Sequence, residues 1–220
     1  MFRLQPVKLH DSQLHGLDSG AELFVVEGDS ASRSVCRARN AQVQAVLPMQ
    51  GKPMNAIKAS KDAVQNFELF RALVTAIGAG WDEQLDLAKL RYDRVILLFD
   101  PDADGIHCGA LMTMFFHRWM RPLLESGRLS VARPPLYEIS SPDSPDKLHA
   151  YSDSHYQRLR AELEKKRIKY QGQRYRGLAS ISEAVLFATC IDPETRNISR
   201  LTSEDAEAAI RIFGGAASMG

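Results

Sequence analysis

Residues 94–105 read RVILLFDPDADG, and this stretch decides the fold class. The apolar run predicts a strand over 94–99, because an unbroken row of branched apolar side chains is typical of a parallel sheet covered on both faces. Three aspartates, Asp100, Asp102 and Asp104, follow at alternate positions, and Gly105 closes the motif. In such sheets ligands sit at the carboxyl ends of the strands. The stretch therefore predicts an α/β fold with a polar site at this edge.

Alternating strand and helix patterns surround this stretch. Their order predicts a parallel or mixed sheet with helices on both faces. Pro48 is expected to stop one strand, Asp29 or Ser30 to cap the helix that follows the first strand, and Gly78 and Gly80 to end another helix. The expected strands are 21–26, 44–47, 94–99 and 129–132, and the expected helices are 29–39, 62–77, 106–125, 153–168 and 203–213.

The chain divides by composition into four predicted parts. Residues 1–20 are a polar lead-in arm, and residues 21–140 are the main α/β domain. Residues 141–170 begin with a Pro/Ser-rich surface connection (SPDSPDKLHA) and continue into a charged helix. Residues 171–220 form a small C-terminal subdomain, with an Arg/Gly-rich loop, a short helix, a turn at Asp192-Pro193 and a frayed end from Gly214.

Length and cysteine usage narrow the class of protein. A chain of 220 residues with 45% hydrophobic residues can bury one sizeable core without the help of disulfides or structural metals. Cys36, Cys108 and Cys190 are scattered and form no CxxC pair, which disfavours a disulfide framework or a zinc site and fits a reducing compartment. We find no apolar leader and no run long enough to cross a bilayer, so a cytoplasmic protein is predicted.

The net charge of +1 predicts no nucleic-acid partner, but the distribution of charge is uneven. Between Asp29 and Asp62 there are six basic residues and no acidic one, and from His155 to Arg176 there are eight basic residues against two acids. A basic face beside an acidic cluster suits a polyanion held against a divalent cation. The alternative is that both stretches are solvated helix faces.

The aspartate motif predicts a magnesium site, with manganese as a second possible ion. Carboxylates that converge at a strand end suit a hard cation, and Mg²⁺ is expected on Asp100 and Asp102. An EF-hand loop is excluded, because its twelfth position would be Leu111 where a glutamate is required. A solvent-exposed turn without metal remains open. Glu27, at the end of the first strand, either transfers protons or shares the metal.

Further segments resemble the TOPRIM module of the B subunits of type IIA topoisomerases, the family of DNA gyrase and topoisomerase IV. The resemblance covers nearly the whole chain in consistent order. Its main landmarks are 8–11 (KLHD), 27–31 (EGDSA), 44–48 (QAVLP), 100–105 (DPDADG), 173–178 (QRYRGL) and 192–196 (DPETR).

This resemblance implies a division of roles among the residues. Glu27 would be the general acid/base for DNA strand cleavage and religation, Asp100 and Asp102 would bind magnesium, and Asp104 would support them. The nucleophilic tyrosine would belong to a separate A subunit. No ATP site is found in this chain, and the ATPase and transducer domains found in the family's B subunits are expected to be absent. The candidate DNA-binding residues are Arg33, Arg39, Lys52, His107, Arg174 and Arg176.

Several positions depart from the family pattern. Ser32 and Arg33 stand where two glycines are usual, and Cys36 stands where a lysine is usual. The residues around His107 differ as well, at Ile106, Gly109 and Ala110, and so does the run Ala179–Ser182. The acidic residues Glu27, Asp100, Asp102 and Asp104 are all retained, so we expect a magnesium-dependent cleavage module acting with a tyrosine-bearing subunit. Two alternatives stay open: a non-catalytic paralogue that regulates by binding the A subunit or DNA, and a stand-alone TOPRIM nuclease.

Overall fold

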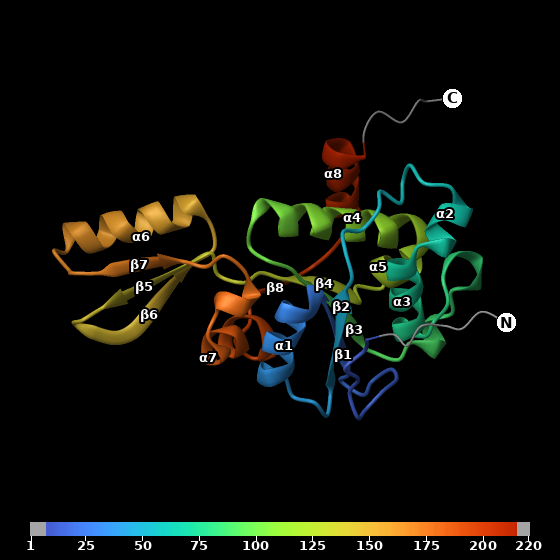
Figure 1. Ribbon diagram of the computed structural model, residues 1–220, viewed down its shortest axis with the longest axis horizontal. Coiled ribbons are helices and arrows are strands. Elements are labelled where there is room, and N and C mark those ends of the chain that lie inside the picture. Colours follow the sequence, from blue (N-terminus) through green and yellow to red (C-terminus); the bar gives the residue numbers. More distant parts are fainter. Residues whose placement is uncertain (1–7, 215–220) are drawn as a thin grey trace.

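A computed structural model describes residues 8–214 and confirms the α/β class (Figure 1). The central sheet has five strands in the order β2-β1-β3-β4-β8. The first four run parallel, and β8 is antiparallel to β4, so the sheet is mixed. Its strands are β1 (Glu22–Glu27), β2 (Gln44–Met49), β3 (Arg94–Leu98), β4 (Leu129–Ala132) and β8 (Ile198–Arg200).

Helices cover both faces of this sheet, as the unbroken apolar strands predict. In β1, Leu23 and Val25 belong to one buried cluster, and Phe24 and Val26 belong to another. Side chains alternate between the faces of a strand, so each cluster lies on one face. The first face packs against α3 (Glu68–Ile77), α4 (Ala103–Trp119) and α5 (Arg121–Glu125), and the second against α1 (Gly28–Ala38) and α7 (Glu183–Leu186).

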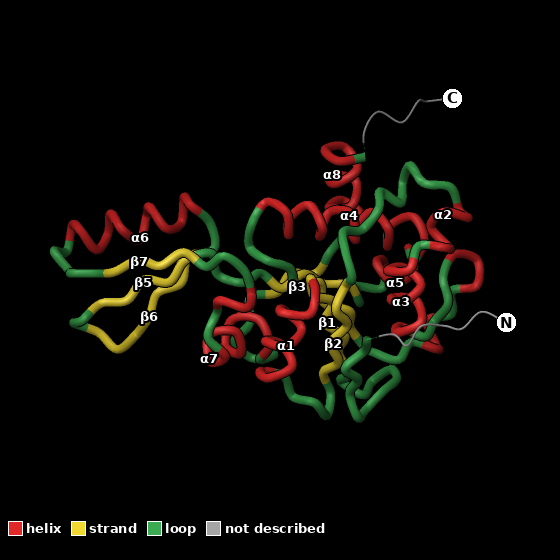
Figure 2. The backbone as a smooth tube through the Cα atoms, in the orientation of Figure 1, coloured by secondary structure: helices red, strands yellow, loops and turns green. Residues whose placement is uncertain are grey.

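A second, three-stranded antiparallel sheet projects from this body, and we call residues 137–174 the lobe (Figure 2). Its order is β6-β5-β7, from β5 (Tyr137–Ser141), β6 (Ser144–Ala150) and β7 (Gln171–Arg174), and α6 (Asp153–Lys165) packs beside it. The segment predicted as a surface connection, 141–150, is exposed but consists mostly of strand β6. The first five residues of β6 are all exposed, so the strand carries no apolar signal. Likewise, the predicted Arg/Gly-rich loop begins as strand β7.

Pro48 does not end its strand, because β2 continues to Met49. Proline has no N–H group to donate to a neighbouring strand, so within sheets it occurs mainly on edge strands. Strand β2 is an edge strand of the sheet and can therefore include Pro48. The predicted cap by Asp29 or Ser30 is also wrong. Helix α1 begins directly at Gly28, whose φ is 72°, and Glu27 is the N-cap residue without a side-chain cap bond. Asp29 lies within the first turn.

Two predicted helices are each divided in two. The helix expected over 62–77 is α2 (Lys61–Asn66) and α3, separated by Phe67 in an extended conformation, and Gly78 ends α3 in the left-handed region. The helix expected over 106–125 begins earlier, at Ala103, and breaks at Met120. Pro122 explains that break: it has no N–H group to donate to the Arg118 carbonyl, and its ring would clash with that carbonyl if α4 continued without interruption.

The remaining elements are short. They are the 3₁₀ turns Asp82–Gln84, Leu87–Lys89 and Leu178–Ser180, and a π-helical turn at Phe187–Ile191. The last helix, α8 (Ser203–Phe213), matches its prediction and packs on the outer side of α4. The predicted frayed end falls mainly on residues 215–220, which lie outside the described residues. Within residues 8–214, no helix has both the length and the apolar character that a bilayer crossing requires.

The described part of the lead-in arm is held on the body by both backbone and side-chain contacts. His10 forms an antiparallel bridge with Val46 on the edge strand β2. Asp11 accepts hydrogen bonds from Tyr92 Oη at 2.6 Å and from the backbone N–H of Ser12 at 2.9 Å, and it also pairs with Arg91 and His15. The arm therefore lies as an ordered segment along β2 and the start of β3.

Candidate metal and acid–base site

The candidate site lies where β1 and β3 end side by side. These strands are parallel neighbours, with Val26 opposite Leu98, so Glu27 and the segment after β3 reach the same edge of the sheet. Asp100 lies in the turn after β3, Asp102 is the N-cap of α4, and Asp104 lies in the first turn of that helix. The four predicted acidic residues therefore gather at one edge, as the strand-end argument predicts.

The glycine of the aspartate motif has a steric reason. Gly105 lies against the backbone of Asp100, and a Cβ atom at this position would come within 2.1 Å of the Asp100 carbonyl oxygen. Its N–H group donates to Asp102 Oδ1 at 2.9 Å, which caps α4. The turn from β3 into α4 is therefore tight enough to require glycine at this position, and this tightness fixes the aspartates.

Asp100 faces the segment that follows β7. Its Oδ1 accepts a hydrogen bond from the backbone N–H of Leu178 at 2.8 Å. A Cβ atom on Gly177 would lie 2.6 Å from Asp100 Oδ2, so this close approach also depends on a glycine. Burial, and to a lesser degree the neighbouring Asp102, raise the pKa of Asp100 despite that hydrogen bond. A bound cation would relieve both effects, because it stabilises the charged carboxylate.

Glu27 has the electrostatic environment of a proton-transfer group. Its pKa is raised, first by burial and then by the negative charges of Asp100, Asp104 and Asp102. Lys52 lowers it in part. A carboxyl group with a raised pKa is more readily protonated near neutral pH and can act as a general acid as well as a base.

Asp104 contacts a lysine and lies beside a cysteine. Its carboxylate forms an ion pair with Lys52, and the hydrogen bond from Lys52 lowers the pKa of Asp104. Within residues 8–214, the group of metal-ligand side chains whose atoms all lie within 4.8 Å of one another is Glu27, Asp104 and Cys108. Asp100 and Asp102 are not part of that group. The predicted assignment of magnesium to Asp100 and Asp102 stays a prediction.

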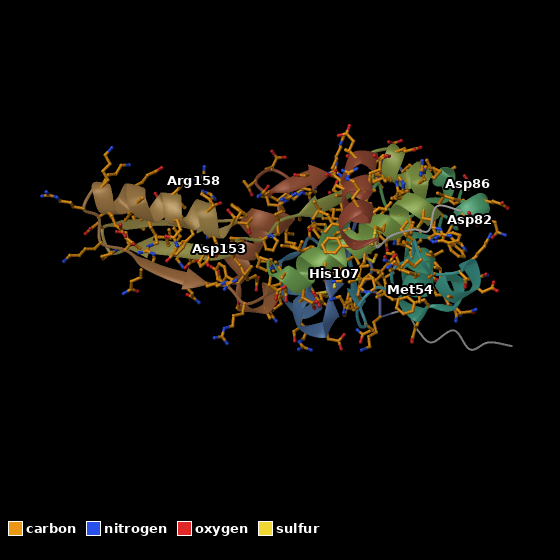
Figure 3. All side chains as sticks on the ribbon, turned by 90° about the horizontal axis from the view of Figure 1, so that it is seen from above. Met54, Asp82, Asp86, His107, Asp153 and Arg158 are labelled. Atoms are coloured by element: carbon orange, nitrogen blue, oxygen red, sulfur yellow. The ribbon has the colours of Figure 1, made fainter. Side chains whose placement is uncertain are left out.

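The predicted DNA-binding residues differ in how freely their side chains can contact DNA. Arg33, Arg174 and Arg176 are exposed, and Arg174 lies over the ring of Tyr137. His107 lies on α4 at the middle of the molecule (Figure 3), where its ring stacks on Phe213 with 4.9 Å between ring centroids.

Arg39 and Lys52 already have partners within the chain. Arg39 donates to the backbone carbonyls of His10, Asp11 and Gln44, and so fastens the lead-in arm to β2. Lys52 is paired with Asp104. DNA contacts by either residue stay predictions, and both would compete with these interactions.

The sequence interpretation missed three contributors to the site. Gly177 and Leu178 contact Asp100 from a segment 77 or more positions away, and the pattern of the sequence gives no indication of such a contact. The cysteine pattern predicts no role for Cys108 at the site. Its signal was present, since it lies four positions after Asp104 and residues at that spacing share one face of a helix.

Comparison with known proteins places the site in a family. Residues 22–134 match the family described as the Toprim domain. The chain belongs to this family. The match includes β1 with Glu27 and the turn with Asp100, Asp102 and Asp104. The expectation drawn from the sequence landmarks is thereby confirmed.

Similar proteins extend the relationship beyond the Toprim match. The chain is 43% identical over 192 residues to the DNA gyrase B subunit of Thermotoga maritima, and 40% identical over 192 residues to that of Archaeoglobus fulgidus. It is 36% identical over 208 residues to the DNA gyrase B subunit of Clostridium acetobutylicum. These alignments cover 87%, 87% and 94% of this chain but only 30%, 29% and 32% of the relatives. The chain thus spans about a third of the length of the curated relatives it matches.

Proposed function

We propose that this Toprim chain supplies the acid–base and metal side of DNA strand cleavage and religation in a type IIA topoisomerase-like complex. The attacking tyrosine comes from a separate A-type subunit. The observation that carries the proposal is the position of Glu27, a carboxyl group with a raised pKa at the sheet edge where the three aspartates gather. The similarity to the DNA gyrase B subunit supports the same assignment.

The donor atoms of the site fit magnesium. Asp100 and Asp102 offer carboxylate oxygens, which Mg²⁺ prefers, and partial burial raises the pKa of Asp100, an effect that a bound cation would offset by stabilising the carboxylate. When bound, the ion would stabilise negative charge on the phosphate and on the leaving oxygen. Manganese, which prefers similar ligands, is the expected substitute.

The residues of this chain perform the proton transfers in the proposed reaction. During cleavage, protonated Glu27 gives its proton to the leaving 3′-oxygen of the DNA, and during religation the carboxylate takes the proton back. Asp100 and Asp102 hold the cation. The exposed Arg33, Arg174 and Arg176 bind phosphates of the DNA backbone, which makes the affinity dependent on salt.

The test compares the unchanged chain with Glu27→Gln on supercoiled plasmid in magnesium, with and without an A-type subunit. We expect ATP-independent cleavage or relaxation only with both subunits. Glu27→Gln should reduce the rate by about 10²–10⁴-fold, the usual contribution of one general acid/base, because the amide cannot donate a carboxyl proton. An equally active Glu27→Gln protein would exclude the assigned role.

A second function is favoured by a specific observation. Gly109 and Ala110 occupy half-buried positions on α4 near His107, where the resemblance implies polar and basic side chains. A paralogue that binds the A subunit or DNA without turnover would keep the fold but lose such contacts. Stable binding to the A subunit without cleavage under any metal would favour that regulatory function. Cleavage by this chain alone would favour the nuclease.

A further inference from the structure

Three side chains with different metal-binding atoms meet beside the end of β1. Glu27 ends that strand, Asp104 lies in the first turn of α4, and Cys108 lies one turn later on that helix. One ligand atom from each lies within 4.8 Å of the other two. Because Asp104 and Cys108 are four positions apart, both project from the same face of α4 toward the end of β1.

The thiol of Cys108 is buried and has no partner. The residue is 1% exposed, its sulfur is in no disulfide, and within residues 8–214 it forms no hydrogen bond. Cysteines buried in a helix ordinarily face apolar neighbours. Cys108 packs in the apolar cluster of the first sheet face, but its sulfur also lies within 4.8 Å of a carboxylate oxygen of both Glu27 and Asp104. Burial, followed by the charges of Glu27 and Asp104, raises the pKa of the thiol to about 11. The strand-cleavage chemistry proposed above does not use this thiol.

A positive charge already sits at this group of side chains. The ammonium of Lys52 pairs with Asp104, and its charge also favours the ionised forms of Glu27 and Cys108. Lys52 is an exposed side chain on a flexible stem, so a metal ion can displace it without rearrangement of the fold. The lysine therefore occupies the place where a cation is favoured.

We propose that Glu27, Asp104 and Cys108 form a binding site for a thiophilic divalent cation of the Zn²⁺ class. Two carboxylate oxygens and one thiolate match the ligands of Zn²⁺, whereas Mg²⁺ takes oxygen ligands only. Zn–S bonds of about 2.3 Å and Zn–O bonds of about 2.0–2.2 Å in a tetrahedral ion place the ligand atoms about 3.4–3.6 Å apart, so atoms now separated by up to 4.8 Å would approach by up to about 1.4 Å. On binding, Lys52 leaves Asp104 and the thiol proton passes to solvent.

This site differs from the magnesium site in ligands and in effect. It shares Glu27 with the proposed reaction, so an ion bound there would occupy the general acid and inhibit cleavage. The fourth position of a tetrahedral ion stays open for water. The inference itself does not rest on the proposed function, because it concerns metal binding in the absence of DNA and of any partner.

Cadmium is the probe, because a Cd²⁺–thiolate bond gives an ultraviolet charge-transfer band that carboxylate ligands do not give. We expect the full chain to develop this band up to about one ion per chain, and added Zn²⁺ to abolish it by competition. Cys108→Ala and Cys108→Val should lose the band while keeping the far-ultraviolet circular dichroism of the fold. Cys36→Ala, which removes the half-buried cysteine, is the matched control and should keep it.

Three further variants distinguish this site from the neighbouring aspartates. Asp104→Asn should weaken Cd²⁺ binding by at least ~10-fold, the loss that even an outer-shell partner of a metal typically causes. Lys52→Met should strengthen it, because the competing ammonium is gone. The double variant Asp100→Ala/Asp102→Ala should keep the band. A full band in both Cys108 variants, or unchanged affinity in Asp104→Asn, would overturn the proposal.

Discussion

At the scale of single residues, glycines determine where the acidic side chains of the site lie. Gly177→Ala should displace Asp100, because the new Cβ would lie 2.6 Å from Asp100 Oδ2. Backbone strain plays no part, since Gly177 has a φ of 173° that any residue adopts. We expect the variant to fold and to lose most magnesium-dependent activity with the A-type partner. Isothermal titration with Mg²⁺ and the plasmid assay measure both effects.

Gly109→Ala is the matched control for that prediction. A Cβ at Gly109 would meet Phe99 Cδ2 at 3.5 Å, an ordinary contact, and the residue lies inside α4. Alanine is favoured over glycine in a helix, so this variant should be more stable by about 0.5–1 kcal/mol in thermal unfolding. If Gly177→Ala kept Mg²⁺ binding and plasmid activity as Gly109→Ala should, the close approach of Gly177 to Asp100 would not be needed for function.

Single residues of the site were predictable where the sequence pattern is local. Asp100, Asp102 and Asp104 follow an apolar strand within a few residues, so their place at the sheet edge could be inferred from the sequence. Gly177 was not predictable as a contact of Asp100, because nothing local marks a loop that returns to the site after the whole lobe. The ion pair of Lys52 was missed for the same reason.

At the scale of elements, the lead-in arm depends on Asp11. Burial alone would raise the pKa of Asp11, but hydrogen bonds from Tyr92, His15 and Arg91 outweigh it and hold the pKa well below its usual range. A carboxyl group with a lowered pKa stabilises the fold above its unfolded pKa of about 3.9 and loses that effect as the pH falls toward the folded value. Asp11→Asn should therefore be less stable near neutral pH.

The difference between the two proteins should shrink below about pH 4, where the unfolded carboxyl becomes protonated and the advantage of the charged form declines. Urea unfolding of both proteins at a series of pH values measures this difference in the free energy of unfolding. A constant difference down to strongly acidic pH would mean that packing of the arm, and not the charge of Asp11, holds it in place. Asp18→Asn, an exposed aspartate on the same segment, is the control.

Elements were predictable from sequence in proportion to their burial. Strand β3 was found because its residues are apolar and its neighbours cover both faces. Strand β6 was missed because its first five side chains are exposed, and a strand exposed on both faces has no periodic pattern to detect. The breaks at Phe67 and Met120 were missed because apolar periodicity continues across them.

At the scale of the whole molecule, a buried ion pair joins the start of β1 to the segment just before β8. Both Nη atoms of Arg196 donate to the carboxylate of Glu22, at 2.6 Å and 2.5 Å, and the Arg196 side chain is 2% exposed. Arg196→Met should cost up to about 3–5 kcal/mol in chemical unfolding, because the buried charge of Glu22 then keeps only the longer ion pair with Arg94, at 3.7 Å, and the hydrogen bond from Gln44.

Replacing both members tests the reason for that loss. Glu22→Leu/Arg196→Met should recover much of the stability, because no buried charge then remains. Arg37→Met is the control, since its ion pair with Glu183 is exposed and 3.9 Å long, and such pairs contribute about 0–1 kcal/mol. Equal losses in the single and double variants would show that packing around Arg196, and not charge, is the cause.

Because strand β8 comes from the C-terminal part of the chain, the central sheet can be completed only late in biosynthesis. The ribosome releases β1 through β4 first, and at that stage β4 has an open edge and Glu22 lacks its arginine, 174 positions away. The sheet therefore closes only after the lobe and the residues up to Arg200 have emerged. A nascent chain stopped earlier would expose a strand edge and an incompletely paired charge, two features that quality-control machinery meets in unfinished proteins.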